Sequence, residues 1–205
     1  MKTLIKICGL TNQESVDVAV QSGADLIGFV FAKKSPRCLT PALASQLSGS
    51  IPAQIKTTAV MLHPSDAEAR EVFSKFLPDY LQTDAKDFIS LHLPEGCRPL
   101  KVYRDLPQLH FDEMNPNELS LFEGQNSGAG ELVNTDHAAA AACHAPIILA
   151  GGLNSGNVVG MLQAVQPKGV DVSSGVESKL GVKDVQKIKD FINIVRDYDA
   201  MKQNA

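Results

Sequence analysis

The sequence has no long apolar run, which limits where the protein can act. No apolar stretch approaches the ~20 residues that a membrane-spanning helix needs. The apolar beginning, from Met1 to Ile7, is followed by Cys8 and Gly9 rather than by the long apolar core of a signal peptide. We therefore expect a soluble protein that stays in the cytoplasm and has no membrane partner.

The sequence also lacks a basic stripe and a paired-cysteine motif. Its 19 lysines and arginines are scattered and are outnumbered by 23 aspartates and glutamates, so no positive field is available for nucleic acid. The four cysteines, Cys8, Cys38, Cys97 and Cys143, form no CxxC pair and no spacing with histidine that suits zinc. These absences predict reduced thiols, no structural metal and no nucleic-acid partner.

Short apolar runs recur along the chain, and segments of helical period separate most of them. Several runs are nearly continuous, such as Ile27 to Phe31, which is typical of strands covered on both faces. This alternation predicts repeated βα units and a parallel sheet. The eight expected strands are Leu4 to Cys8, Leu26 to Phe31, Lys56 to Leu62, Tyr80 to Thr83, Leu100 to Tyr103, Leu119 to Glu123, Pro146 to Ala150 and Gly169 to Ser173.

Six segments between these runs are expected to be helical. The last of them carries one apolar stripe at steps of three and four residues, which predicts a long helix packed on the core. The segments Asp84 to His92 and Pro107 to Asn115 are long enough for only a turn or two. The six expected helices are Asn12 to Ser22, Pro41 to Leu47, Ser65 to Phe76, Thr135 to Ala145, Gly156 to Val165 and Lys183 to Gln203.

Length and repeat number together favour a closed barrel. With 205 residues, of which 44% are hydrophobic, the chain suits one core, because single cores tend to split above ~250 residues. An open doubly wound sheet more often has a glycine-rich first turn, and the turn from Cys8 to Thr11 has no GxGxxG signature. We therefore predict that residues 1–205 form a single α/β domain, a (β/α)8 barrel of the TIM type near the ~200-residue lower limit for that fold.

The loops after the last three strands are rich in glycine and serine. Ligands of such barrels bind at the loops that follow the strands, and a phosphate often binds after strands seven and eight. Adjacent glycines let backbone N–H groups approach an anion, although each glycine pair alone also suits a tight connecting turn. The predicted phosphate-binding residues are Gly128, Gly130, Gly151, Gly152, Ser173, Ser174 and Gly175.

A cysteine ends the first strand, where its side chain can point into the barrel mouth. Lys6 points to the same side of the strand as Cys8, so one interpretation is a thiol with a depressed pKa. The other interpretation is a small buried apolar residue, which we also expect for Cys38, Cys97 and Cys143. Carboxylates at other strand ends, Glu123, Asp171 and Asp84, are either solvated loop acids or partners for the thiol in proton transfer.

Four segments of the chain resemble the phosphoribosylanthranilate isomerase family of tryptophan biosynthesis. The resemblance covers the whole chain in the right order. Its Cys-Gly pair after the first strand is specific, because related phosphosugar barrels usually have an aspartate there. The segments are Lys6-Ile7-Cys8-Gly9-Leu10-Thr11, Gly28-Phe29-Val30-Phe31 with Lys34-Ser35-Pro36-Arg37, Leu149-Ala150-Gly151-Gly152-Leu153-Asn154, and Gly169 to Glu177, with Gly181, Lys183 and Asp184 extending the match.

The resemblance implies an isomerase that needs no cofactor and no metal. Its reaction is the Amadori rearrangement of N-(5-phosphoribosyl)anthranilate to 1-(2-carboxyphenylamino)-1-deoxyribulose 5-phosphate. By the same resemblance, Cys8 is the general base and Glu123 the general acid. Arg37 binds the anthranilate carboxylate, which its planar fork can meet with two hydrogen bonds. Gln82 and Asp171 are further substrate-binding residues, and the protein is a monomer or a homodimer.

The chain departs from the family pattern at the fourth and sixth strands. It has Leu121-Phe122-Glu123 where the family has Leu-Leu-Asp, and Asp84 where the family has a histidine. It also has Val133-Asn134-Thr135 in place of Phe-Asp-Trp. Asp84 is therefore a rival to Glu123 as the acid. Two other functions stay open: an isomerase or epimerase of another phosphorylated sugar, and a non-catalytic barrel that binds a phosphorylated metabolite or a partner protein.

Overall fold

The computed structural model describes residues 2–125, 130 and 132–203. Eight parallel strands pair in sequence order, and pairing of the first with the eighth closes them into a barrel. This confirms the predicted (β/α)8 barrel. The strands are β1 (Leu4–Cys8), β2 (Leu26–Val30), β3 (Lys56–Val60), β4 (Tyr80–Asp84), β5 (Arg98–Arg104), β6 (Ser120–Glu123), β7 (Ile147–Leu149) and β8 (Gly169–Val172).

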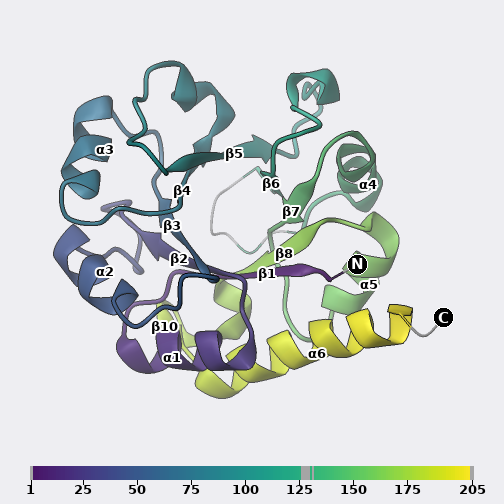
Figure 1. Cartoon of the computed structure of the whole chain (residues 1–205). Helices are drawn as coiled ribbons and strands as arrows, with labels where there is room; N and C mark the ends of the chain where they lie inside the picture. The colour runs from purple at the N-terminus through teal and green to yellow at the C-terminus, as the bar shows by residue number, and fades with distance from the viewer. Residues whose placement is uncertain (1, 126–129, 131, 204–205) are drawn as a thin grey trace.

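Helices surround the barrel on its outside (Figure 1). After β4 and β5 the helices are short 3₁₀ turns, η1 (Ala85–Ile89) and η2 (Phe111–Glu113), as the weak patterns there predict. None of the helices in the described part of the chain is long and apolar enough to cross a membrane. The α-helices are α1 (Gln13–Ser22), α2 (Pro41–Ser48), α3 (Asp66–Phe73), α4 (Thr135–His144), α5 (Val158–Val165) and α6 (Val185–Gln203).

Several helices begin where the sequence supplies a capping side chain. The Asn12 side chain accepts a hydrogen bond from the first turn of α1. At α3, Ser65 and Glu68 form a reciprocal capping box. At α4, the Asn134 side chain accepts a hydrogen bond of 3.0 Å from the backbone N–H of His137. The altered segment around Asn134 therefore keeps a well-defined helix start, which fixes where the loop after β6 returns to the barrel wall.

One addition to the predicted fold follows β8. A short 3₁₀ turn, η3 (Ser174–Val176), leads into an antiparallel hairpin of β9 (Glu177–Lys179) and β10 (Val182–Lys183). The sequence analysis did not predict this hairpin, because two or three residues are too few to show an alternating pattern. Its position matters for function, since it brings Glu177 and Lys183 back to the open end of the barrel.

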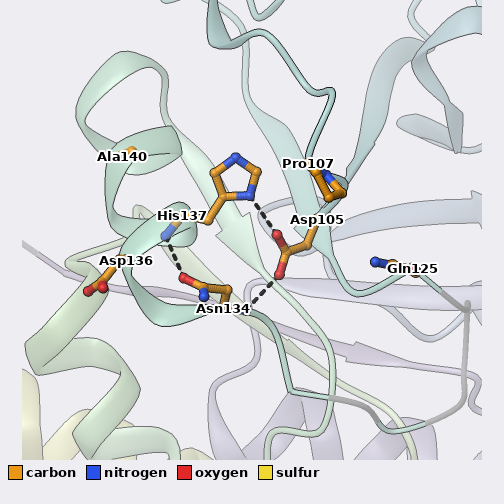
Figure 2. A pocket seen from close by; sticks show the side chains of 7 residues that line it. All are labelled: Asp105, Pro107, Gln125, Asn134, Asp136, His137 and Ala140. Atoms are coloured by element: carbon orange, nitrogen blue, oxygen red, sulfur yellow. Dashed lines mark hydrogen bonds and ion pairs between the residues drawn. The ribbon is translucent and has the colours of Figure 1, made fainter.

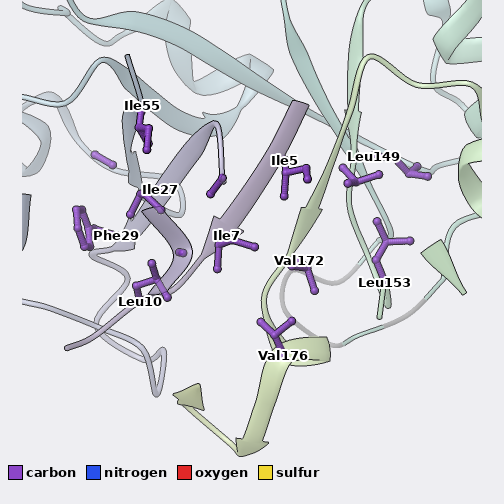
Figure 3. Close-up of a cluster of buried hydrophobic side chains, with 14 of the residues drawn as sticks. Ile5, Ile7, Leu10, Ile27, Phe29, Ile55, Leu149, Leu153, Val172 and Val176 are labelled. Carbon is purple, nitrogen blue, oxygen red and sulfur yellow. The ribbon is translucent and has the colours of Figure 1, made fainter. Parts of the chain in front are cut away.

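Apolar side chains form two separate layers. Because neighbouring residues of a strand point to opposite faces, Ile5 and Ile7 face the surrounding helices (Figure 3), whereas Lys6 and Cys8 face the barrel interior. The interior is plugged by a second apolar cluster that includes Leu26, Leu100, Leu121 and Ile148. This plug closes the barrel below its C-terminal end, so a ligand can enter only from the side where the loops following the strands lie.

The other end of the barrel is tied to the last helix. Thr3 donates to Asp199 of α6 through its backbone nitrogen at 3.0 Å and its hydroxyl at 2.5 Å. Arg196 of the same helix donates to Asp25 at 2.5 Å. Burial alone would raise the pKa of Asp25, but hydrogen bonds from Lys2 and Arg196 hold it below the ordinary value. The first strand and the last helix are thus joined by charged hydrogen bonds.

All four cysteines are free thiols. Cys8 and Cys97 are buried, and burial raises the pKa of Cys97 to about 11. Cys38 and Cys143 are exposed. The expectation that these two are small buried residues is therefore wrong. Cys143 lies on the face of α4 opposite its buried Ala138 and Ala141, a position that the alanine-rich sequence did not distinguish.

Candidate functional site

A cavity of about 390 Å³ opens at the C-terminal ends of the strands, and we call it the mouth cavity. Its walls include five of the predicted catalytic and substrate-binding residues. They come from four strands and one loop, which shows that the closed barrel brings sequence-distant strand ends together. The five are Cys8, Arg37, Gln82, Glu123 and Asp171.

On one side of the mouth cavity, Cys8 lies next to a buried ion pair. Lys6 is completely buried in the barrel interior, and its Nζ lies 3.0 Å from Oδ1 of Asp171. Gly28 of the neighbouring strand makes room for both side chains. A Cβ atom at Gly28 would lie only 3.0 Å from the Cys8 Sγ and 3.2 Å from the Lys6 Nζ. The thiol and the ammonium group are therefore held against the same small patch of β2.

Burial and charge act in opposite directions on this group. Burial would lower the pKa of Lys6, but the Asp171 carboxylate and Cys8 outweigh it, so the pKa lies above its ordinary value. Burial raises the pKa of the Cys8 thiol, and the nearby Lys6 cation only partly opposes this effect. In the free protein Lys6 is thus protonated and Cys8 is mainly a thiol. The interpretation of Cys8 as a thiol with a depressed pKa is wrong, although Lys6 lies where that interpretation placed it.

Arg37 is buried and reaches the mouth cavity in a fixed orientation. Its Nε donates to Glu177 at 2.6 Å and its Nη2 donates to the other carboxylate oxygen at 3.0 Å. Glu177 also accepts from Lys183 at 2.9 Å and from the Gly181 backbone at 3.0 Å. Burial would raise the pKa of Glu177, but hydrogen bonds from Arg37 and Lys183 lower it to about 2. The β9–β10 hairpin therefore supplies the Glu177 carboxylate that fixes the orientation of Arg37.

On the other side of the mouth cavity, Arg104 joins two carboxylates. Its Nη1 donates to Glu123 at 2.6 Å, while its Nε and Nη2 donate to Asp84 at 3.1 and 2.5 Å. Sequence reasoning missed Arg104, although a signal was present. Val102 and Arg104 are two residues apart on β5, so their side chains point to the same face of the strand. Because Val102 lies in the barrel interior, Arg104 also faces inward, one layer nearer the opening.

Gln82 has an unusual hydrogen-bonding state. It is buried and lines the mouth cavity, yet its Oε1 has no hydrogen-bond partner within the described part of the chain. A buried acceptor without a partner costs about 1–3 kcal/mol. A bound hydroxyl or N–H group that donates to this oxygen would remove the cost. Gln82 is therefore a suitable ligand contact.

The predicted phosphate-binding loops converge in space. Gly152 has a left-handed φ of +60°, and a Cβ atom there would lie 2.6 Å from the carbonyl oxygen of Gly130. Gly130 in turn faces the Ser174 hydroxyl, with 3.5 Å between its notional Cβ and that oxygen. A side chain at position 152 would clash with the backbone of the neighbouring loop, so only glycine fits there. The same loops hold Gly151 and Gly175, whereas Gly128 lies outside the described residues.

The two serines after β8 have different surroundings. Ser174 faces Gly130, as described above. Ser173 instead accepts a hydrogen bond of 3.1 Å from Lys183 through its hydroxyl, and it lines the mouth cavity. The two adjacent serines thus contact different parts of the protein, and their place in one phosphate site stays a prediction.

A second hollow, of about 630 Å³, lies between the loop after β5 and the start of α4 (Figure 2). Three of its polar residues, Asp105, Asn134 and His137, are paired with one another. The His137 Nδ1 lies 2.6 Å from Asp105, and Asp105 also accepts from the Asn134 backbone at 2.6 Å. Across the described residues no group of three or more histidine, cysteine or acidic side chains is placed to hold a metal. The mouth cavity, which combines a thiol, carboxylates and guanidinium groups, is the candidate active site.

Comparison with known proteins is consistent across sequence and structure. A family model described as N-(5'-phosphoribosyl)anthranilate (PRA) isomerase matches residues 5–194. A relative from Bordetella petrii, named N-(5'-phosphoribosyl)anthranilate isomerase, is 35% identical over 218 residues that cover 97% of each chain.

Two solved structures have the same fold. The crystal structure of phosphoribosyl anthranilate isomerase from Thermus thermophilus superposes with a TM-score of 0.83 at 23% identity, covering 95% of this chain and 99% of that one. A phosphoribosyl anthranilate isomerase in complex with reduced 1-(o-carboxyphenylamino)-1-deoxyribulose 5-phosphate superposes with a TM-score of 0.79 at 26% identity and the same coverage. The second structure binds a phosphorylated sugar derivative.

Proposed function

This chain belongs to the N-(5'-phosphoribosyl)anthranilate isomerase family, and we propose on that premise that its mouth cavity catalyses the isomerisation of N-(5'-phosphoribosyl)anthranilate in tryptophan biosynthesis. One observation carries the proposal. The Cys8 thiol and the Glu123 carboxyl lie on non-neighbouring strands in the wall of one cavity, with Arg37 reaching the same space. A base and an acid that face one substrate from different strands are what two successive proton transfers require.

The proposed reaction conserves every atom of the substrate. Glu123 protonates the ring oxygen, the bond from C1 to that oxygen breaks, and the nitrogen lone pair forms the C1=N bond of a protonated Schiff base. The Cys8 thiolate then removes the C2 proton, which leaves an enolamine. Transfer of the hydroxyl proton to C1 turns the enolamine into the 1-amino-1-deoxyketose. Glu123 loses one proton and Cys8 gains one, so a proton exchange between enzyme and water resets both groups.

Lys6 has a defined part in this proposal. Because burial raises the pKa of Cys8, the thiolate is a minor species of the free protein. The Lys6 ammonium group, held 3.0 Å from Asp171, provides a fixed positive charge beside the sulfur. We propose that Asp171 acts in two ways: it holds Lys6, and it presents its cavity-facing edge to a substrate hydroxyl.

The other substrate contacts follow from the chemistry of each group. Arg37 binds the anthranilate carboxylate, with Glu177 fixing the plane of the guanidinium group. Gln82 accepts a hydrogen bond from the substrate at its unpartnered Oε1. The phosphate binds at the loops of Gly130, Gly151, Gly152, Ser174 and Gly175. Ser173 lies between this site and the sugar, where Lys183 orients its hydroxyl.

We place the reaction in the cytoplasm, since four free thiols suit a reducing compartment. Nucleic acid and membrane have no part in it, and the protein is a monomer or a homodimer.

A direct assay tests the function. Purified protein is mixed with freshly prepared N-(5'-phosphoribosyl)anthranilate, and the deoxyribulose product is followed by chromatography. We expect turnover, and we expect the gene to rescue a bacterial tryptophan auxotroph that lacks this isomerase. Folded protein that neither turns over the substrate nor rescues the strain contradicts the proposal. In that case, binding of a stable phosphorylated product analogue distinguishes a binding protein from an enzyme with another sugar substrate.

A second experiment tests the phosphate site. Crystals grown with a phosphorylated product analogue should show the phosphate against the backbone near Gly152 and Ser174. An analogue bound in the mouth cavity with its phosphate elsewhere contradicts this part of the proposal, while leaving the proton-transfer residues untouched.

A further inference from the structure

Arg104 is fixed in orientation by Asp84. Two of its nitrogens, Nε and Nη2, donate to Oδ1 of Asp84 at 3.1 and 2.5 Å. The guanidinium group is planar and rigid, so two bonds to one carboxylate leave it little freedom to turn. Its third nitrogen, Nη1, then points along β6 and donates to Glu123 Oε1 at 2.6 Å. Asp84 thus determines where Arg104 presents its Nη1 donors.

Further ionisable groups extend this arrangement away from the cavity. His63 lies in the loop after β3 with a left-handed φ of +46°, an uncommon conformation for a residue other than glycine. Its Nε2 lies 3.8 Å from Asp84 and its Nδ1 lies 3.1 Å from Asp87. The Thr83 hydroxyl donates to the same Asp87 at 2.6 Å. His63 therefore lies near Oδ2 of Asp84, whereas Arg104 donates to its Oδ1.

We propose that Asp84 and Arg104 are positioning residues for the general acid Glu123: Asp84 orients Arg104, and Arg104 holds the Glu123 carboxyl in the wall of the mouth cavity. The proposal rests on the proposed function for the role of Glu123. It also explains why a glutamate works at this strand end. The side chain has an additional rotatable bond compared with aspartate, and the ion pair with Arg104 restricts that freedom.

The charges of the two partners affect Glu123 in opposite directions. Arg104 favours the ionised carboxyl of Glu123, whereas Asp84 is a nearby negative charge that opposes ionisation. The other charged or titratable side chains that line the mouth cavity are Cys8, Lys34, Arg37 and Asp171. None of these is changed in the variants below. A change in the titration of Glu123 therefore reports on Asp84 and Arg104.

The experiment follows the Glu123 carboxyl directly. Protein with ¹³C-labelled glutamate is titrated by NMR, and Glu123 is assigned from the signal lost in Glu123→Gln. In Arg104→Met, we expect the titration midpoint to rise by about one unit or more, because a cation is removed. In Asp84→Asn, we expect it to fall, because a negative charge near Glu123 is removed while the Arg104 cation stays.

Two further variants control the experiment. Arg104→Lys keeps the charge but loses the planar fork, so the midpoint should stay closer to wild type than in Arg104→Met. Arg98→Met removes an exposed arginine from the opposite end of the same strand, and it should leave the midpoint unchanged. Midpoints that shift in the same direction in Arg104→Met and Asp84→Asn, or that do not shift, contradict the proposal. Folding of each variant is checked by thermal unfolding, and Arg104→Gln, which also removes the charge, replaces Arg104→Met if the latter does not fold.

Kinetics on the same variants separate positioning from binding. We expect kcat of Arg104→Met to fall about 10- to 100-fold, because misplacing a reacting group by about 1 Å costs as much as 100-fold. KM should change little, since Arg104 is not proposed to bind substrate. The NMR titration needs no substrate, so it can support the positioning role even if the isomerase assay fails. Conversely, an active wild type with unshifted midpoints contradicts the positioning role and leaves the function in place.

Discussion

The two sides of the mouth cavity both combine one cation with acids, but at different depths. On the β1–β8 side, the Lys6 and Asp171 side chains are 0% and 9% exposed, and the thiol of the proposed base, Cys8, lies beside the pair. On the β4–β6 side, the side chains of Arg104, Asp84 and Glu123 are 13–14% exposed, and the carboxyl of the proposed acid, Glu123, is itself part of the ion pair.

This difference suits the two proton transfers. A buried cation beside Cys8 is a permanent charge, because water cannot screen it and Asp171 keeps it protonated. At the rim, Glu123 can exchange a proton with solvent between turnovers while Arg104 keeps it in place. From this comparison we propose that the base depends on a fixed electrostatic environment, whereas the acid depends on a fixed geometry. The predictions below test each half of that statement.

The largest expected effect is on the β1–β8 side. We expect Cys8→Ser to lower kcat by ~100-fold or more, since a hydroxyl is a far weaker base than a thiolate and a positioned base contributes ~100- to 10,000-fold. KM and thermal stability should change little. Steady-state kinetics measure this, with Cys143→Ser, at an exposed thiol, as the control. Near-normal turnover of Cys8→Ser means that Cys8 only packs the barrel interior.

The matching test on the β4–β6 side removes the acid. We expect Glu123→Gln to be nearly inactive and to bind substrate normally, because the amide keeps the shape of the side chain but cannot protonate the ring oxygen. Glu118→Gln, outside the mouth cavity, is the control. If Asp84→Asn abolishes turnover and Glu123→Gln leaves most of it, Asp84 is the acid instead.

Shortening the acid tests geometry alone. We expect Glu123→Asp to lose about 10- to 100-fold in kcat, although it restores the residue of the family pattern, because the carboxyl moves away from Arg104 by more than ~1 Å. The variant Glu123→Asp keeps the charge, so a purely electrostatic role predicts no loss. Full activity of Glu123→Asp would show that the loop adapts to either length and that geometry is not limiting.

The ion pair between Glu177 and Arg37 should contribute to the free energy of unfolding in a pH-dependent manner. Removing one partner of a buried ion pair costs about 3–5 kcal/mol, so Glu177→Gln should lower the free energy of unfolding by about that amount near neutral pH. The pKa of Glu177 is lowered from 4.5 to about 2, so the stabilisation is complete above 4.5 and is lost as pH falls toward 2.

Denaturant unfolding at several pH values measures this stabilisation. We expect the difference in free energy of unfolding between wild type and Glu177→Gln to become smaller as pH falls, because the protonated glutamate then resembles the glutamine. Glu95→Gln, at an exposed site, should show no gap at any pH. A gap that is independent of pH would indicate lost packing rather than a lost charge.

The smallest expected effect concerns the thiol itself. Because burial raises the pKa of Cys8, its alkylation by iodoacetamide should begin only at more alkaline pH than that of the exposed Cys38. Peptide mass spectrometry separates the cysteines in one sample. Removing the cation in Lys6→Met should move the Cys8 profile to still higher pH, provided that the variant folds. Alkylation of Cys8 at lower pH than Cys38 would contradict the direction of the shift.

Much of the fold can be predicted because its local signals are strong. β1 matches its predicted range, Leu4 to Cys8, and the other seven strands differ from theirs by at most two residues at either end. In a chain of this size, a continuous apolar run such as Ile147 to Ala150 rarely forms anything other than a buried strand. The strand ends then follow from the barrel, which is why the sequence predicts Cys8, Glu123 and Asp171 at one opening, where the mouth cavity lies.

The contacts between side chains could not be predicted in the same way. The bond from Arg104 to Asp84 depends on the register of β5 against β4, in which Asp84 is level with Val102, and no local pattern encodes that register. The exposure of Cys143 depends on which face of an alanine-rich helix turns inward, and alanine does not mark that face clearly. The pKa of the Cys8 thiol is raised because burial outweighs the effect of the nearby Lys6 cation. The sequence reveals the cation but not the burial.

Closure of the barrel between β1 and β8 also has a consequence for how the enzyme is made. Lys6 is separated by 165 residues from Asp171, the carboxylate that neutralises it. Translation at ~5–20 residues per second therefore leaves the nascent chain without this partner for about 8 to 33 seconds. During that time the interior lysine has no counter-charge and β1 has no neighbour on one edge. The side of the mouth cavity that holds the proposed base can therefore form only when synthesis is almost complete.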